Sequence, residues 1–208
     1  MNHFLKTVSN IFTSEFKERG SKFIGYLIPA KSEEEFDEQL QKLKTELWDA
    51  SHHCYAYRIG ASDTTEFSSD DGEPSGTAGL PILNQLRSNE LVDVCAVVVR
   101  YFGGTKLGKS GLIEAYGEGA KQAIEASKLK TVIPCVWFEV SYEYSEENII
   151  QKLRQDFQLH EKDSEYLENV ILTVAAPKEL SDSFKNRLEE LAHLSISFKK
   201  LDSGYYFS

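Results

Sequence analysis

Residues 92–102 read VDVCAVVVRYF, and residues 103–110 continue as GGTKLGKS. The first stretch is apolar and rich in β-branched residues, which favours a central strand that is buried on both faces of a sheet. The second stretch is a glycine-rich turn, and a helix is expected after it, from Leu112 to about Ser127. This succession of strand, turn and helix decides the fold of the first part of the chain.

Upstream of this stretch the sequence predicts a hairpin, a helix, a third strand, a long loop and a short helix. Arg19-Gly20-Ser21 forms the hairpin turn, and Ser32 with Glu35 forms a capping box at the start of the first helix. A polar loop as long as residues 61–79 is unusual inside a compact domain unless it has a function. The strands are expected at residues 12–17, 23–28 and 53–59, and the helices at residues 32–47 and 80–87.

Downstream, Leu129–Pro134 is expected to be a linker between two domains, residues 1–130 and 135–208. The second domain shows the order β-α-β-β-α-β, which is typical of the ferredoxin-like arrangement. Its helices are expected at residues 146–157, capped by Ser145, and 180–191. Its strands are expected at residues 137–144, 159–166, 170–176 and 195–201. The fold class predicted for the whole chain is α+β.

Composition indicates a soluble, ordered protein. The chain has 208 residues, 41% of them hydrophobic, which is enough to bury an ordinary core. No signal peptide and no membrane helix is expected, because the longest apolar run is Cys95–Val99. Three widely spaced cysteines in apolar surroundings indicate buried, reduced thiols. A cytoplasmic location is therefore expected.

The net charge of −10 opposes broad electrostatic attraction to nucleic acid or to an anionic membrane, although it permits a local basic patch. From Trp137 onward the chain has 14 acidic and 8 basic residues, net −6, so the remainder is net −4. A nucleic-acid surface is therefore expected on the first domain rather than on the second. Nothing in the sequence specifies an oligomeric state.

Residues 103–110 satisfy the phosphate-binding pattern G-x-x-x-x-G-K-[ST] between a predicted strand and a predicted helix. Three features oppose a working nucleotidase: no other strand ends in a metal-holding Asp, the alternating β/α order is missing, and the domain opens with a hairpin. A weaker hypothesis remains. The turn, flanked by Arg100, Lys106 and Lys109, is expected to bind an anion through backbone donors and local charge.

The loop Ser68–Gly79 carries three carboxylates, Asp70, Asp71 and Glu73, within four residues. Such a cluster can bind Mg²⁺ or Ca²⁺, or present acceptors to a basic partner. The alternative is an ordinary solvated turn, in which Asp71-Gly72 supplies a left-handed backbone position.

His52, His53 and Cys54 lack a second ligand pair at zinc spacing, so the sequence predicts no metal site and no cofactor. His52 or His53 remains a candidate proton carrier. Aromatic residues close to the two loops can stack on bases or pack in the core, and for Phe102 the core is expected.

Three groups of residues together resemble the Impact/YigZ family. The resemblance spans roughly Lys22–Ala126, and the motifs match in order and spacing. They are Ser51–Tyr57; Asp70–Pro74 with Gly76–Gly79 and Pro81; and Val99–Gly104 with Leu107-Gly108.

The resemblance implies a first domain of the ribosomal-protein-S5-domain-2-like β/α type, followed by a ferredoxin-like domain, as in two adjacent domains of the translocating elongation factor. It also implies that the match to the nucleotide-binding pattern is accidental, because the family usually has Gly at the position of Ser110. The residues that it assigns to the family's signature surface are Asp70, Asp71, Glu73, Arg100, Tyr101, Gly103 and Gly104.

Eukaryotic relatives act in translational control by competing for a partner that activates a stress-responsive kinase. They carry an additional N-terminal interaction domain that has no counterpart in these 208 residues, so that role is not expected to transfer directly.

Three functions follow as hypotheses. The first is a non-catalytic, regulatory binding protein that engages RNA, the ribosome or a translation-associated protein through residues 68–79 and 100–111. The second is a small-molecule or metal-dependent hydrolytic enzyme that uses Asp70, Asp71 and Glu73 with His52 or His53. The third is a scaffold whose acidic loop meets a basic protein.

Overall fold

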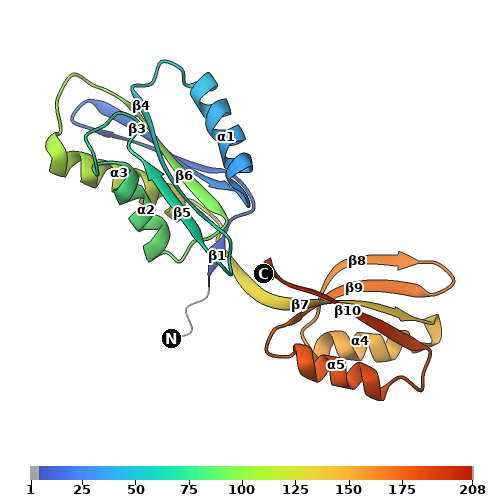
Figure 1. Ribbon diagram of the computed structural model, residues 1–208. Coiled ribbons are helices and arrows are strands. Elements are labelled where there is room, and N and C mark those ends of the chain that lie inside the picture. Colours follow the sequence, from blue (N-terminus) through green and yellow to red (C-terminus); the bar gives the residue numbers. More distant parts are fainter. Residues whose placement is uncertain (1–4, 208) are drawn as a thin grey trace. The chain divides into compact units, whose positions relative to one another are not determined.

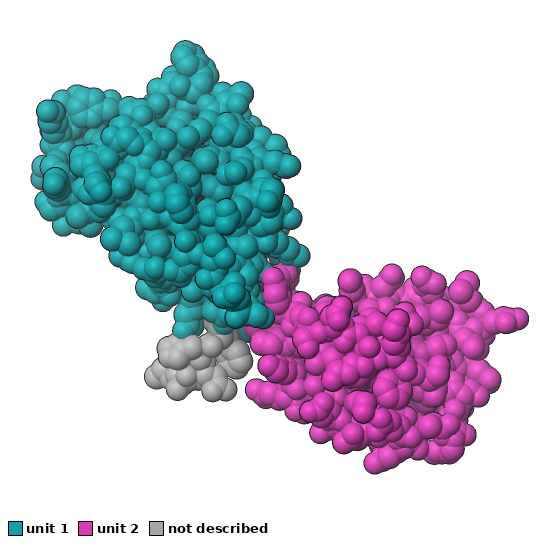
Figure 2. Space-filling view, in the orientation of Figure 1, with its two compact units in different colours: residues 1–131 teal, residues 132–208 magenta. Residues whose placement is uncertain are grey.

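The computed structural model describes residues 5–207. The chain divides into two compact units, residues 1–131 and 132–208, which Figure 2 shows in different colours. Each unit combines helices with an antiparallel sheet, which confirms the predicted α+β class. Among the described residues, no helix is long and apolar enough to cross a membrane.

The sheet of the first unit has five strands in the order β2-β3-β6-β4-β5, and every neighbouring pair is antiparallel. The central strand is β6, which confirms the interpretation of residues 92–102. The strands are β2 (Phe12–Glu18), β3 (Ser21–Pro29), β4 (His52–Ile59), β5 (Thr65–Ser69) and β6 (Val94–Tyr101).

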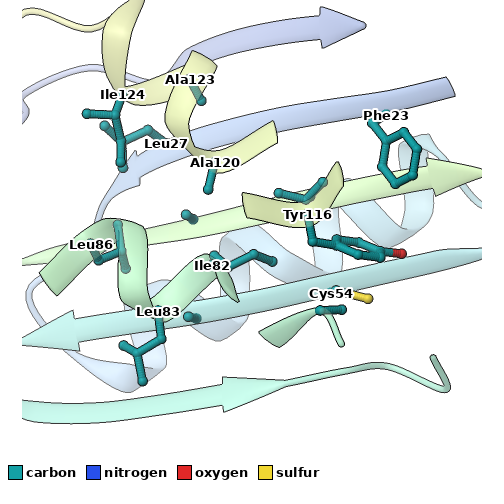
Figure 3. Packing of buried hydrophobic residues seen from close by; sticks show 14 of the residues in the cluster. Phe23, Leu27, Cys54, Ile82, Leu83, Leu86, Tyr116, Ala120, Ala123 and Ile124 are labelled. Carbon is teal, nitrogen blue, oxygen red and sulfur yellow. The ribbon is translucent and has the colours of Figure 1, made fainter. Parts of the chain in front are cut away.

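Helices cover both faces of this sheet, with α1 (Glu33–Glu46) on one face and α2 (Gly79–Ser88) and α3 (Gly108–Glu125) on the other (Figure 1). Cys95, Val97 and Val99 of β6 belong to the apolar cluster under α1. Val94, Ala96 and Val98 belong to the cluster under α2 and α3, part of which Figure 3 shows. Because each face is buried, β6 has no polar alternation.

The predicted cap at the start of α1 is present. The Ser32 hydroxyl accepts a hydrogen bond from the Glu35 backbone N–H at 3.2 Å. The Glu35 carboxylate returns the interaction by accepting from the Lys31 N–H at 2.8 Å, one residue before the capping serine. Three acidic residues in the first turn, at positions 33–35, add a favourable interaction with the helix dipole.

Three predictions for the first unit are wrong. Residues 61–79 are not a continuous loop, because β5 lies within them as a polar edge strand with little apolar signal. Leu129–Pro134 is not a linker, because β7 (Lys130–Tyr142) begins there and its first two residues pair with β1 (Lys6–Thr7). Helix α3 begins at Gly108, four residues before the predicted Leu112, so Lys109 and Ser110 lie in its first turn.

The second unit has the predicted order β-α-β-β-α-β, which is the element order of the ferredoxin-like arrangement. Its strands lie in the order β8-β9-β7-β10, and all pairs are antiparallel. The core includes Phe138, Leu172 and Phe184. The remaining elements are α4 (Glu147–Asp156), β8 (His160–Tyr166), β9 (Val170–Pro177), α5 (Ser181–Glu190) and β10 (Ile196–Phe207).

Two boundaries in the second unit differ from the prediction. Ser145 does not cap α4, because a 3-10 turn over Tyr144–Glu146 precedes the helix and no side chain caps it. Strand β10 continues to Phe207 instead of ending at Leu201, because its later residues pair with β7 as far as Phe207 opposite Val132.

Candidate functional site

The two loops with the sequence motifs lie at the same edge of the first sheet. Strand β4 is antiparallel to both β5 and β6, so β5 and β6 run in the same direction and end at the same edge. The acidic loop follows β5, and the glycine-rich turn follows β6. Both contribute to one pocket of about 330 Å³, which is lined by Glu73, Pro74, Arg100, Phe102, residues 106–109 and Leu112.

A buried ion pair joins the two loops at this pocket. The Arg100 Nη1 donates to Glu73 Oε1 at 2.6 Å, and the two side chains are only 6% and 5% exposed. The Tyr116 hydroxyl of α3 donates to the same Oε1 at 2.8 Å, and His52 Nε2 lies 3.8 Å from it. Burial, the nearby Cys54 and Glu73 raise the pKa of Tyr116 far above its ordinary value, so this hydroxyl is a fixed donor.

Two aromatic rings flank the guanidinium of Arg100. Its central carbon lies 5.5 Å from the ring centre of Phe23 and 5.4 Å from that of Phe102. Phe23 is buried, whereas Phe102 is 50% exposed, so the prediction that Phe102 packs in the core is wrong. Phe102 lies just beyond the end of β6, outside the buried part of the strand.

Arg100, one of the three residues expected to flank an anion-binding turn, has its charge already paired within the chain. Its Nη1 is bound to Glu73 and its Nη2 donates to the Ser21 hydroxyl at 3.3 Å. Its Nε is buried and has no hydrogen-bond acceptor among the described residues. The positive charge that remains at the pocket comes from Lys106 and Lys109, both exposed.

The start of α3 adds backbone donors to this positive charge. Leu107 is the N-cap residue, and no side chain caps the helix. The first four N–H groups of a helix have no partner within the helix, and the dipole there attracts anions. Gly108, which opens α3, lines the pocket between the two lysines.

The turn between β6 and α3 is held by backbone packing. Gly103 lies so close to the hairpin turn between β2 and β3 that a Cβ atom on it would be 1.9 Å from the Gly20 carbonyl carbon. The Gly103 N–H donates to the Ser21 hydroxyl at 3.2 Å, and the Phe102 N–H donates to the Ser51 hydroxyl at 3.1 Å. Gly104 has a φ of +88° and open space around it.

Tyr101, the last residue of β6, lies beside this turn. Its hydroxyl donates to Asp49 at 3.1 Å, and the Lys22 ammonium lies 4.8 Å from its ring centre. Burial and the hydrogen bond to Asp49 raise the pKa of Tyr101. Tyr101 therefore fixes the edge of the sheet and does not line the pocket.

Asp70 organises the acidic loop. Its carboxylate accepts hydrogen bonds from the backbone N–H groups of Gly76, Ala78 and Gly79, at 2.8, 2.9 and 2.9 Å. Burial raises the pKa of Asp70, but these three donors outweigh it and hold the pKa below its ordinary value. Since α2 begins at Gly79 without a side-chain cap of its own, Asp70 serves as its cap from nine residues away.

Asp71 holds the same loop against β4 and α1. Its carboxylate accepts from the His53 backbone N–H at 2.6 Å and from the Lys44 ammonium at 3.3 Å. Its carbonyl oxygen lies 2.8 Å from His52 Nδ1. Its φ of +42° agrees with the left-handed position that the sequence predicts there.

The three carboxylates of the acidic loop therefore point to three different sets of partners. No group of three or more His, Cys, Asp or Glu side chains that could hold a metal ion is present among residues 5–207. The metal-binding alternative for Asp70, Asp71 and Glu73 is therefore not supported. The cysteines at 54, 95 and 135 are free and buried, as predicted.

A second pocket, of about 310 Å³, shares Leu107 with the first as a lining residue. It is lined by three carboxylates on β2 and α3, those of Glu18, Glu114 and Glu118, and by one cation, Arg19. Leu107 thus lines both a pocket with lysines and a pocket that is rich in carboxylates.

Sequence reasoning missed two residues that complete the site, Ser21 and Tyr116. Ser21 bridges Arg100 and the Gly103 N–H, and it lies 79 residues from Arg100 in the sequence. Tyr116 belongs to the apolar face of α3, where a tyrosine usually indicates core packing. The one available signal for Ser21 and Tyr116 was a polar group at a position where a buried side chain is expected.

The fold and the pocket define a class: a two-unit α+β protein whose first unit has a pocket between two loops. Residues 19–124 match the model of the Impact N-terminal domain, and residues 140–193 match a domain of unknown function (DUF1949). The chain belongs to the IMPACT family, which confirms the resemblance described above.

Relatives match over most of the chain. The IMPACT family member YvyE of Bacillus subtilis is 35% identical over 99% of this chain and 94% of its own length. The IMPACT family member YigZ of Escherichia coli is 34% identical over 88% of this chain and 90% of its own length. A Protein IMPACT homolog of Saccharomyces cerevisiae is 35% identical over 44% of this chain and 36% of its own length. A solved structure described as a hypothetical protein is 31% identical, has a TM-score of 0.64, and covers 97% of this chain and 99% of that one.

Proposed function

We propose that this chain is a non-catalytic, regulatory binding protein linked to translation. In this proposal the pocket between residues 68–79 and 100–111 engages RNA, within the ribosome or alone, in the cytoplasm. The observation that carries it is the lining of the pocket, which combines Lys106, Lys109 and the uncapped start of α3 with an exposed aromatic side chain, Phe102. Helix starts and lysines bind phosphate, and exposed aromatics stack on bases.

The family supports the link to translation. The resemblance to IMPACT proteins implies translational control in eukaryotic relatives and likeness to two domains of an elongation factor. A translation-associated protein partner remains the alternative within this proposal. The overall charge of −10 makes any RNA contact local, so binding should depend on the two pocket lysines far more than on other lysines.

The enzyme alternative keeps one observation in its favour, the approach of His52 to Glu73 beside the pocket. However, the Glu73 oxygen that His52 approaches already accepts from Arg100 and Tyr116. The scaffold alternative is weakened in the same way, because Asp70 and Asp71 are occupied by contacts within the chain. Both alternatives therefore rank below RNA binding.

Co-sedimentation of the full chain with ribosomes, at about 50 and 200 mM salt, tests the proposal. The unmodified chain should pellet with ribosomes at the lower salt concentration and much less at the higher one. Lys106→Ala with Lys109→Ala should weaken binding and should make its salt dependence shallower, by about 1 unit of slope for each phosphate that no longer has a lysine beside it.

The matched control is Lys42→Ala with Lys128→Ala, which removes the same charge from positions that do not line the pocket. It should bind like the unmodified chain. No pelleting at low salt, or equal weakening by the two double substitutions, would overturn the proposal.

A further inference from the structure

The pocket between the two loops has three recognition features at fixed places. Its mouth carries the positive charge of Lys106, Lys109 and the start of α3. Its wall is apolar and includes Phe102, Leu107 and Leu112. Its floor carries the polar side chains of Glu73 and Arg100, which are buried by more than nine-tenths. The pocket therefore combines exposed positive charge, apolar lining side chains and buried hydrogen-bonding groups.

The floor has hydrogen-bonding capacity that the protein does not use. The three contacts of the Glu73 carboxylate all involve Oε1: Arg100, Tyr116 and His52. No hydrogen bond to Oε2 is present among the described residues. A carboxylate oxygen accepts about two hydrogen bonds, so Glu73 can still accept an N–H from a ligand. The Nε of Arg100 is also without an acceptor among these residues, so the floor is polar but incompletely satisfied.

The wall offers a stacking surface. Phe102 is 50% exposed, and the Arg100 guanidinium lies 5.4 Å from its ring centre. The flat, electron-poor ring of a ligand can therefore lie against Phe102 and add to the contact that Phe102 already makes with the Arg100 guanidinium. Exposed aromatic side chains beside a cationic groove are typical of proteins that bind single-stranded nucleic acid.

The size of the pocket limits the ligand. A volume of about 330 Å³ lies near the lower end of ligand pockets, which span about 300–1,000 Å³. One base with its sugar and phosphate suits this size, and two stacked nucleotides do not. A sugar phosphate would leave the aromatic wall unused, and a nucleoside without phosphate would leave the mouth unused.

We propose that this pocket binds a single unpaired nucleotide. The phosphate lies at Lys106, Lys109 and the start of α3, and the base lies against Phe102 with an N–H donated to Glu73 Oε2. This inference rests on the proposed function, because it names the part of an RNA that the pocket receives. The same chemistry can come from a free mononucleotide or from one nucleotide of a strand.

The test is a titration of the ¹⁵N-labelled full chain, followed by NMR, with each of the four ribonucleoside 5′-monophosphates. Inorganic phosphate and the matching nucleosides are titrated in parallel. At least one monophosphate should shift the amide signals of Gly104 and Gly108 and bind about tenfold tighter than phosphate or nucleoside alone, since both ends contribute. A single-stranded RNA of eight nucleotides forms the second arm.

Two variants and one control complete the design. Phe102→Ala should weaken monophosphate binding about tenfold, as expected when a base-stacking ring is removed. Lys106→Ala with Lys109→Ala should abolish the advantage of the monophosphate over the nucleoside. Trp48→Ala removes an aromatic side chain that is 80% exposed and does not line the pocket. It should change neither the affinity for the monophosphate nor the advantage of the monophosphate over the nucleoside.

Each outcome separates this inference from the proposed function. Ribosome binding that depends on the lysines, without monophosphate binding and without an effect of Phe102→Ala, overturns the inference and leaves the proposed function standing. Monophosphate binding without binding to the RNA or to ribosomes supports the pocket but overturns the proposed function. Phosphate binding as tightly as the monophosphates shows an anion site alone and overturns the inference. Failure of every ligand, with no binding to ribosomes either, overturns both.

Discussion

The Arg100 guanidinium and the Glu73 carboxylate approach to 2.6 Å across 27 residues of sequence, with both side chains almost entirely buried. This contact joins the end of the central strand to the acidic loop. It also places one positive and one negative charge at the floor of the pocket, where Tyr116 donates to Glu73 and Arg100 donates to Ser21. The pocket therefore depends on a pair of opposite charges, and each loop supplies only one of them.

Removing one member of this pair should be costly. Arg100→Met or Glu73→Leu should each lower the free energy of unfolding by about 3–5 kcal/mol, because a buried charge is left without its partner. The double variant should be destabilised much less than the sum of the two single variants. Urea denaturation followed by circular dichroism measures these differences.

The control for the ion pair is Arg87→Met, because the Arg87 side chain is 47% exposed where it pairs with Glu66. An exposed pair contributes at most about 1 kcal/mol, so this variant should unfold nearly like the unmodified chain. Additive destabilisation by the Arg100 and Glu73 substitutions would contradict the coupling.

Two neighbouring glycines should differ in their tolerance of a methyl group. Gly103→Ala should lower the free energy of unfolding by about 3 kcal/mol or more, because the added Cβ would overlap the Gly20 backbone, which cannot rotate away as a side chain does. Gly104→Ala should cost only about 1–2 kcal/mol, the strain of its positive φ, since its Cβ would have open space. Thermal unfolding compares the two, and a larger destabilisation at Gly104 would refute the steric account.

Asp70 should contribute stability that depends on pH. Asp70→Asn removes the charged acceptor for three backbone N–H groups and should cost about 1–2 kcal/mol at neutral pH, as removal of a helix cap does. Hydrogen bonds in the folded state lower the pKa of Asp70, so its contribution is fully present above the unfolded value of about 3.9. It is lost as pH falls through the lower, folded pKa.

Unfolding free energies of the unmodified chain and of Asp70→Asn, measured from pH 7 to pH 2.5, check this. The difference between them should stay constant down to about pH 4 and shrink below it. Asp37→Asn, at an exposed position on α1, serves as the control and should show no such change. A difference that grows as pH falls would contradict the assignment.

Much of the fold was predictable because its signals are local. The apolar run of β6, the Ser32 cap and the element order of the second unit each depend on residues close in sequence. Strand β5 was not predictable, because an edge strand exposed to solvent needs no apolar alternation. The start of β7 was missed because its first residues are stabilised by pairing with Lys6–Thr7, more than 120 residues away.

For the site, the sequence predicted the two loops but not how their side chains are used. Asp70 and Asp71 form a conspicuous acidic cluster, yet each is occupied by backbone donors of the chain itself. Arg100 looked like a free cation because Glu73, its partner, is 27 residues earlier. Side-chain pairing between distant segments depends on three-dimensional packing that no short motif encodes.

The contact between Gly103 and Gly20 has a consequence for how chains of this design can vary. With no side chain between the two backbones, the hairpin turn after β2 and the turn after β6 act as one steric unit. An extra residue in the hairpin turn would push the opposite turn aside and deform the pocket. A change in the length of either turn should therefore be tolerated only together with a compensating change in the other. The shape of the pocket then depends on the lengths of both turns.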